Sequence, residues 1–137
     1  MSVPRLLWKN VVPRGDYHAA LVSSRFRLRT QLHTHDFFEM IYVLDGRGTH
    51  EINGQAFPLT PGDLIFVRPE DRHAISAREG NELHIVNIAF SADAWEDFRA
   101  LVGLTDDAFA ATSCGPPPIV QVPVTRREEC ARVFQRA

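Results

Sequence analysis

Residues 33–73 decide the fold, and they read HTHDFFEMIYVLDGRGTHEINGQAFPLTPGDLIFVRPEDRH. Short runs rich in β-branched and aromatic residues alternate here with turn signals such as Asn53-Gly54 and Pro61-Gly62-Asp63. The pattern predicts strands at residues 37–44, 49–52, 55–59, 64–67 and 73–77, with further strands at 26–28 and 82–90. Strands at this spacing, with no helix between them, are typical of an all-β sandwich or a small barrel.

The hydrophobic period becomes helical after residue 90. Ser91 can cap a first helix that ends at Gly103, and its apolar positions are Trp95, Phe98, Leu101 and Val102. Beyond three successive prolines, Thr125-Arg126-Arg127-Glu128 has the form of a capping box and predicts a second helix. The apolar stripe of that helix, which we expect to need a partner surface, consists of Cys130, Val133, Phe134 and Ala137.

The composition fits one globular domain. The chain has 137 residues and a mass of 15.5 kDa, of which 45% are hydrophobic and 23% charged, so a second catalytic domain has no room. It has no apolar run of about 18 residues, and we expect no signal peptide and a cytoplasmic location. Because the net charge is −2 and the arginines are interleaved with acidic residues, this chain by itself is predicted to bind DNA poorly.

Four residues have the types and spacing of a metal site, namely His33, His35, Glu39 and His73. The first three share one parity, and can therefore share one face of a strand, while the fourth follows a turn on a later strand. Three imidazoles and a carboxylate suit zinc, iron, nickel or manganese. Two interpretations without a metal remain open. The histidines can form hydrogen bonds inside a core, or Glu39 can pair with Arg27 or Arg29.

The same stretch carries a family resemblance. His33-x-His35-x3-Glu39-x6-Gly46 resembles the first cupin motif, and Gly62 to His73 resembles the second in altered form. Arg27 and Asp71 replace glycines of those motifs, and the usual asparagine after the last histidine is missing. Residues 33–73, with HIVNIAFSADAWEDF at 84–98, are similar to the N-terminal effector-binding domain of AraC-family bacterial transcription regulators. The resemblance implies a mainly β cupin barrel, a double-stranded β-helix or jelly roll, with one or two C-terminal helices.

The resemblance also implies a domain organisation and partners. Residues 1–120 would form a cupin-like sensor domain with its N-terminal arm, and residues 121–137 would begin a linker or dimerisation helix. The DNA-binding half of such regulators is absent from this chain. Expected partners are a small-molecule effector, a sugar or sugar derivative, and a second copy in a homodimer. No membrane partner is expected, and DNA would be bound only through the absent half.

The effector is expected to enter the barrel and to contact the four candidate ligands directly or through a divalent transition metal. Trp8, Arg27 and Arg29 are the further candidate ligand-binding residues. The alternatives are that Trp8 caps the edge of the barrel and that the arginines point into water. A small metal-dependent cupin enzyme (a dioxygenase, isomerase or epimerase) is the rival function. The altered second motif, without a tyrosine or lysine acid/base beside it, favours a binding domain that is not an enzyme.

Overall fold

The computed structural model describes residues 2–12, 14–24, 29–103 and 115–136. Its strands are β1 (Arg5–Leu6), β2 (Tyr17–Ser24), β3 (Thr34–His35), β4 (Phe38–Gly46), β5 (Gly48–Ile52), β6 (Gln55–Leu59), β7 (Asp63–Val67), β8 (His73–Ala77), β9 (Leu83–Phe90) and β10 (Ile119–Gln121). The helices are α1 (Trp8–Val11), α2 (Ala92–Val102) and α4 (Arg127–Gln135), and a 3-10 turn at Val124–Arg126 precedes the last. The predicted strand at 26–28, and with it Arg27, lies outside the described residues.

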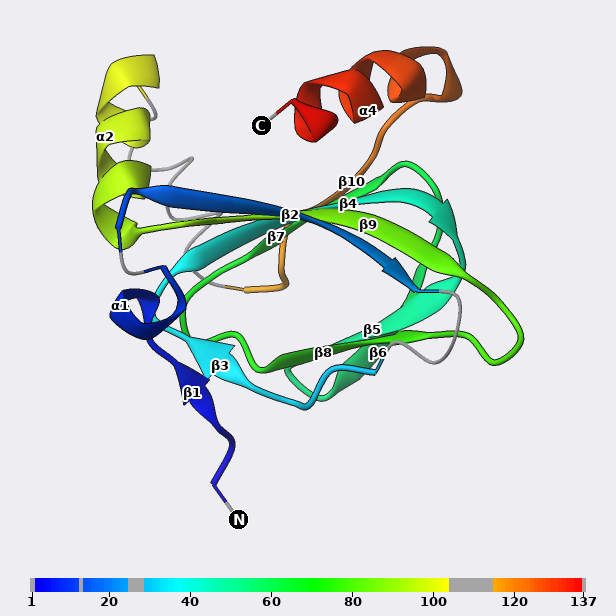
Figure 1. The fold of residues 1–137 in the computed structure, drawn as a ribbon, viewed down its shortest axis with the longest axis horizontal. Coiled ribbons are helices and arrows are strands. Elements are labelled where there is room, and N and C mark those ends of the chain that lie inside the picture. Colours follow the sequence, from blue (N-terminus) through cyan, green and yellow to red (C-terminus); the bar gives the residue numbers. More distant parts are fainter. Residues whose placement is uncertain (1, 13, 25–28, 104–114, 137) are drawn as a thin grey trace.

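Two sheets form the barrel. The larger has the strand order β10-β7-β4-β9-β2 and the smaller the order β6-β5-β8, with antiparallel pairing throughout. Figure 1 shows the two sheets facing each other, with α2 and α4 over the outer side of the larger one. This confirms the predicted mainly β fold with C-terminal helices. β6 and β8 have the predicted bounds, whereas β4 runs on to Gly46 because an irregularity after Val43 keeps it paired with β9.

Aliphatic side chains fill the space between the sheets, because alternate residues of each strand point inward. The buried cluster consists of Ile41, Val43, Ile52, Leu59, Ile65, Val67, Ile75, Leu83 and Ile85. On β4 the residues of opposite parity face the helices, and Tyr42 is one of them. One strand therefore connects the interior of the barrel with its outer surface.

α2 has the predicted ends. The Ser91 hydroxyl accepts a hydrogen bond from the backbone N–H of Ala94, and Gly103 ends the helix in the left-handed conformation at φ +66°. Its Trp95 packs on the outer face of the large sheet, within 5.3 Å of the Phe38 ring and 5.0 Å of the Phe66 ring. Part of the predicted apolar face remains exposed, as at Leu101.

α4 begins later than predicted, at Arg127. The capping box expected at Thr125 is wrong, since no side chain in the described ranges caps the first turn of this helix. Pro123 starts a 3-10 turn instead, and this turn places the Arg126 guanidinium 2.6 Å from the Glu129 carboxylate. An ion pair on the surface thus stands where the hydroxyl cap was expected.

The apolar stripe of α4 finds part of its partner surface in this chain. The Phe134 ring stacks on Tyr42 with 5.2 Å between centroids, and Cys130 packs against the same cluster. The Tyr42 hydroxyl also donates to the Arg127 carbonyl at 3.3 Å. Val133, by contrast, stays exposed. The helix is therefore fixed to the back of β4 through Tyr42, which stacks on Phe134 and donates to the Arg127 carbonyl.

The N-terminal arm is held against β3 and the residues that follow it. β1 pairs in parallel with β3, and the backbone N–H of Trp8, at the start of α1, donates to the Asp36 carboxylate at 2.7 Å. The Trp8 ring meets Phe37 edge-on at 5.5 Å. None of the helices in the described ranges is long and apolar enough to cross a lipid bilayer.

Candidate functional site

Both sheets contribute a side chain to one buried cluster. His35 on β3, Glu39 on β4 and His73 on β8 place their ligand atoms within a few ångströms of one another. The two Nε2 atoms of the histidines lie 3.2 Å apart, and each lies 3.4 Å from Oε2 of Glu39. All three side chains are almost completely buried. The pairing of His33 with His73 fixes this arrangement, because it joins the start of β3 to β8.

Hydrogen bonds set the tautomers of the histidines. Nδ1 of His35 lies 2.5 Å from the Phe37 carbonyl oxygen, which only accepts, so this nitrogen carries the proton. When the His35 ring is neutral, its Nε2 has a lone pair, and His73 donates to it from its own Nε2, 3.2 Å away. Nδ1 of His73 in turn accepts from Nε2 of His50, at 3.1 Å. The three rings thus form one chain of contacts, and Nε2 of His35 and Nε2 of His73 also face Oε2 of Glu39.

Two acceptors in this region lack a donor. Asn87 on β9 donates from Nδ2 to Oε1 of Glu39 at 3.1 Å. The other carboxylate oxygen, Oε2 of Glu39, and the amide oxygen of Asn87 are buried without a hydrogen-bond partner in the described part of the chain. Leaving a buried acceptor without a donor costs about 1–3 kcal/mol. Such atoms indicate a place for a ligand that supplies donors or positive charge.

The electrostatics keep the Glu39 carboxylate charged at neutral pH. Burial lowers the pKa of His73 to about 3 and that of His50 to about 4, although the charge of Glu39 opposes both shifts. Burial also acts to raise the pKa of Glu39, but the imidazoles of His35 and His73 and the Asn87 amide outweigh it and lower the value to about 2. An anionic carboxylate therefore lies in a cluster where the imidazoles of His73 and His50 are neutral.

A small cavity opens beside the carboxylate. It has a volume of about 120 Å³ and is lined by Val22, Thr30, His33, Glu39, Ile41, His73, Ile75, Ile85 and Asn87. One wall is polar and the other aliphatic. Because the aliphatic residues belong to the barrel core or pack against it, the cavity lies inside the barrel.

Three of the four predicted metal ligands lie close together, and the fourth, His33, lies beside them. The structure brings together His35, Glu39 and His73. His33 lines the cavity, and its ring centroid lies 4.4 Å from that of His73, but its Nδ1 donates to the Gln31 carbonyl and the residue is not part of the close group. The predicted binding of a metal by these residues stays a prediction.

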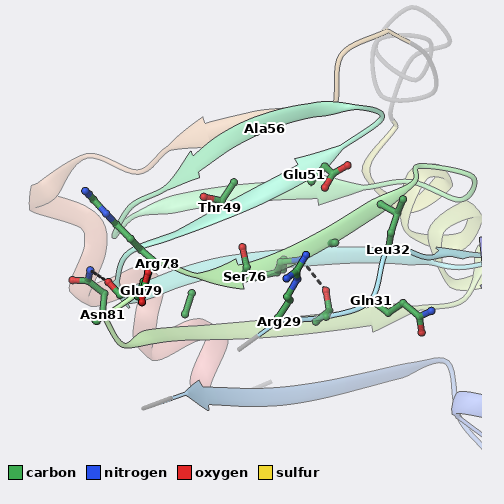
Figure 2. A pocket seen from close by; sticks show the side chains of 15 residues that line it. Arg29, Gln31, Leu32, Thr49, Glu51, Ala56, Ser76, Arg78, Glu79 and Asn81 are labelled. Atoms are coloured by element: carbon green, nitrogen blue, oxygen red, sulfur yellow. Dashed lines mark hydrogen bonds between the residues drawn. The ribbon is translucent and has the colours of Figure 1, made fainter. Parts of the chain in front are cut away.

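Two of the candidate ligand-binding residues, Trp8 and Arg29, do not line the cavity. Trp8 packs on Phe37 and does not line it. Arg29 is exposed and belongs to an open groove of about 1010 Å³ on the outward side of β5 and β8, where Figure 2 places it near Ser76, with Thr49 and Glu51 on the same face. Arg27 is outside the described residues. Ligand contact by any of the three stays a prediction.

Two residues of the site were not predicted from the sequence. His50, which belongs to none of the motifs, is fully buried behind His73; its Nε2 lies 3.1 Å from Nδ1 of His73, and its own Nδ1 has no partner among the described residues. Asn87 was not considered. The signal for both is strand alternation, since His50 has the parity of the buried Ile52, and Asn87 that of the buried Ile85. A polar side chain at an inward position between aliphatic ones marks a candidate site.

The distances within the close group match those of a tetrahedral metal site. Ligand atoms about 2.0–2.1 Å from a zinc ion at tetrahedral angles are separated by about 3.3–3.4 Å. The three separations observed are 3.2, 3.4 and 3.4 Å. The donor set of two imidazoles and one carboxylate also suits zinc.

Comparisons with known proteins identify the relatives of this chain. Residues 21–136 match the family model described as the AraC-like ligand binding domain. The chain is 32% identical over 94 residues to the HTH-type transcriptional activator RhaR of Enterobacter sp. (strain 638), an alignment covering 68% of this chain and 33% of that protein. It is 38% identical over 72 residues to RhaS of Yersinia pestis (strain Pestoides F), covering 53% and 25%. The matches thus span a third or less of these relatives' length.

Solved structures show the same fold at low identity. A Cupin 2 conserved barrel domain protein from Salinispora arenicola CNS-205 has a TM-score of 0.53 and 16% identity, over 63% of this chain and 72% of that one. ToxT from Vibrio cholerae has a TM-score of 0.62 and 6% identity, over 88% of this chain and 48% of that one. With a family model that matches most of its length, the chain belongs to the family of AraC-like ligand binding domains.

Proposed function

We propose that this domain senses a small-molecule effector, a sugar or a related polyol, in the cavity inside the barrel. The observation that carries the proposal is the make-up of the cavity, with Glu39, His73 and Asn87 on one wall and aliphatic side chains on the other. The hydroxyl groups of a sugar need polar partners, and its C–H faces pack on apolar surface. The cavity of about 120 Å³ is smaller than ordinary ligand pockets of about 300 Å³ or more, so it would have to widen when a sugar binds. The curated relatives are transcriptional activators, which supports a sensing role rather than an enzymatic one.

Two chains of contacts connect the cavity with the surface of the domain, and we propose that ligand binding acts through them. β4 carries Glu39 on its inner side and Tyr42 on its outer side, where α4 rests. On the other route, the ring of His35 stacks on Phe37 at 4.4 Å, and Phe37 contacts Trp8 of the N-terminal arm. A ligand shifts α4 or the arm only if it binds one arrangement better than the other. In a longer regulator, this would change how a dimer presents its DNA-binding parts.

Blocking the cavity tests where the effector binds. Val22→Phe adds a ring to the cavity lining, whereas Thr49→Phe adds the same kind of bulk to the outer groove. We expect monosaccharides that raise the melting temperature of the unmodified protein to lose this effect in Val22→Phe and to retain it in Thr49→Phe. The opposite result would move the binding site to the outer groove. A panel in which no sugar or polyol binds the unmodified protein would contradict the proposed function.

We also propose that His35, Glu39 and His73 can hold one divalent metal ion, because their separations fit a tetrahedral site. Binding would require His73 to carry its proton on Nδ1, donating to His50, so that Nε2 is free. The ion would neutralise the carboxylate. The cost would be a proton left on Nδ1 of His50, an atom that has no partner among the described residues.

Metal content after incubation with zinc and gel filtration tests this second proposal. We expect about one equivalent per chain in the unmodified protein and almost none in His73→Ala, since two ligands hold zinc far more weakly than three. His18→Ala, which removes an exposed histidine of β2, is the matched control and should retain the metal. Equal zinc in all three proteins would show that it binds elsewhere.

A further inference from the structure

The local sequence of α4 does not account for its stability. The helix has nine residues, of which Phe134 alone is buried, and a helix of this length is not stable by itself in water. No side chain in the described ranges caps its first turn. Its first residue, Arg127, carries a positive charge at the end where the helix dipole favours a negative one. Contacts with the barrel must therefore keep this helix folded.

The Arg127 guanidinium makes the contacts that fix the start of the helix. Its Nε donates to the carbonyl oxygen of Val122 at 3.1 Å, and its Nη2 donates to Oε1 of Gln121 at 2.8 Å. The other end of the Gln121 amide, Nε2, donates to the carboxylate of Asp63, a buried residue at the start of β7. Both hydrogen bonds of the Gln121 amide thus have a charged partner, and such bonds are stronger than neutral ones.

The turn before β7 leaves room for this guanidinium. A Cβ atom built on Gly62 would lie 2.5 Å from Nε of Arg127 and 3.0 Å from its Cζ, so the guanidinium occupies the place that a side chain would take. The backbone N–H of Gly62 donates to the Val43 carbonyl at 2.9 Å, and the Gly62 carbonyl accepts from the N–H of Val122 at 2.8 Å. The start of α4 is therefore connected with both β4 and β7. We call the residues around the guanidinium the Arg127 seat, and they are Gly62, Asp63, Gln121 and Val122.

From these contacts we propose that α4 is a strap that can open. While the guanidinium occupies its seat, the helix stays folded on the outer face of β4, where Figure 1 shows it over the larger sheet. When the guanidinium leaves the seat, the helix unfolds, the barrel remains intact, and the apolar cluster that contains Tyr42 and Val86 is uncovered. None of the four seat residues lines the cavity, so this inference is independent of the proposed function and needs no ligand for its test.

Removing the guanidinium tests the strap. Arg127→Met keeps most of the length of the side chain and has a similar helix propensity, but it has no hydrogen-bond donor. We expect the backbone N–H groups of α4 to exchange with deuterium about tenfold faster or more in this variant, while those of β4 and β9 exchange as before. Arg132→Met removes an exposed arginine from the same helix and should change the exchange of α4 by less than about twofold.

The direction of the change distinguishes the seat from a local effect on the helix. Removing a positive charge from the start of a helix improves its interaction with the helix dipole, so a local effect would slow the exchange in Arg127→Met. Unchanged or slower exchange of α4 would therefore overturn the proposal. Equally faster exchange in α4, β4 and β9 would mean that the helix and the barrel open as one unit, and would overturn it too.

A second variant empties the seat from the side of the barrel. The methyl group of Gly62→Ala would displace the guanidinium, at a residue with φ +91°. Gly54→Ala is the control for backbone strain, because Gly54 has φ +82° and open space around it. We expect Gly62→Ala, but not Gly54→Ala, to speed the exchange of α4 relative to that of β9.

Combining the two changes tests whether Gly62 acts through Arg127. In the double variant Gly62→Ala/Arg127→Met, α4 should exchange no faster than in Arg127→Met alone, because both changes empty the same seat. Effects that multiply in the double variant would show that the two residues act on the helix separately. That result would overturn the proposed seat.

Discussion

Gly46→Ala is expected to leave little folded protein at 25 °C, with a loss of about 4 kcal/mol or more from the free energy of unfolding. Gly46 ends β4 with φ +93°, a conformation that side chains rarely adopt. A Cβ atom built there would lie 1.9 Å from the carbonyl oxygen of Glu82 and 2.8 Å from Cα of Leu83. The obstacle is backbone at the start of β9, so a rotamer change cannot relieve it. Urea denaturation followed by circular dichroism measures the loss.

Gly54→Ala is the matched control. Gly54 has φ +82° in the turn between β5 and β6, but a Cβ atom there would meet no other atom within 4 Å. This variant should therefore show the conformational cost alone, about 1 kcal/mol. Similar losses in the two variants would mean that β4 and β9 do not approach as closely at Gly46 as the structure shows.

Lowering the pH from 7 to 5 is expected to reduce the free energy of unfolding by nearly as much as Gly46→Ala does. His50 and His73 are held neutral in the folded protein, with pKa values lowered to about 4 and about 3, and they regain the ordinary value of 6.5 on unfolding. Between pH 6.5 and the lowered values the unfolded state binds more protons, so stability falls as the pH falls. From pH 7 to pH 5 each histidine should contribute a loss of about 2 kcal/mol, or about 4 kcal/mol together. Urea denaturation of EDTA-treated protein at the two pH values tests this.

His50→Gln separates this effect from other causes of acid sensitivity. Glutamine can still donate to Nδ1 of His73 but does not titrate, so the loss between the two pH values should fall to about half. Glu39 adds little in this range, because its lowered pKa of about 2 takes effect only as the pH falls below its ordinary value of 4.5. Equal stability at pH 7 and pH 5 would show that the buried histidines are already protonated.

The sequence predicted the barrel well because its turns have strong local chemistry. Asn53-Gly54 and the turn before Asp63 fix where strands end, and β6 and β8 appear with the expected bounds. The start of α4 was mispredicted because tertiary contacts set it, through the 3-10 turn after Pro123 and the packing of Phe134 on Tyr42. A capping motif is a local preference, and such contacts override it.

The sequence predicted those parts of the candidate site that follow from the alternation of side chains along one local segment. His35 and Glu39 converge as expected, although the chain bends between β3 and β4. The separation of His33 from the close group depends on its pairing with β8, which spacing within one segment does not reveal. Asn87 became part of the site only when β9 was placed beside β4. Non-local strand pairing is the information that motif spacing lacks.

The chain has two tryptophans, and the fold gives each a different neighbourhood. Trp95 is buried between α2 and the outer face of the large sheet, among phenylalanine rings. Trp8, on the arm, touches the phenylalanine that stacks on His35. Intrinsic fluorescence of a Trp95→Phe protein would therefore come from the arm alone. The fluorescence of Trp8 would thus report, without an added label, on changes one aromatic ring away from the candidate site.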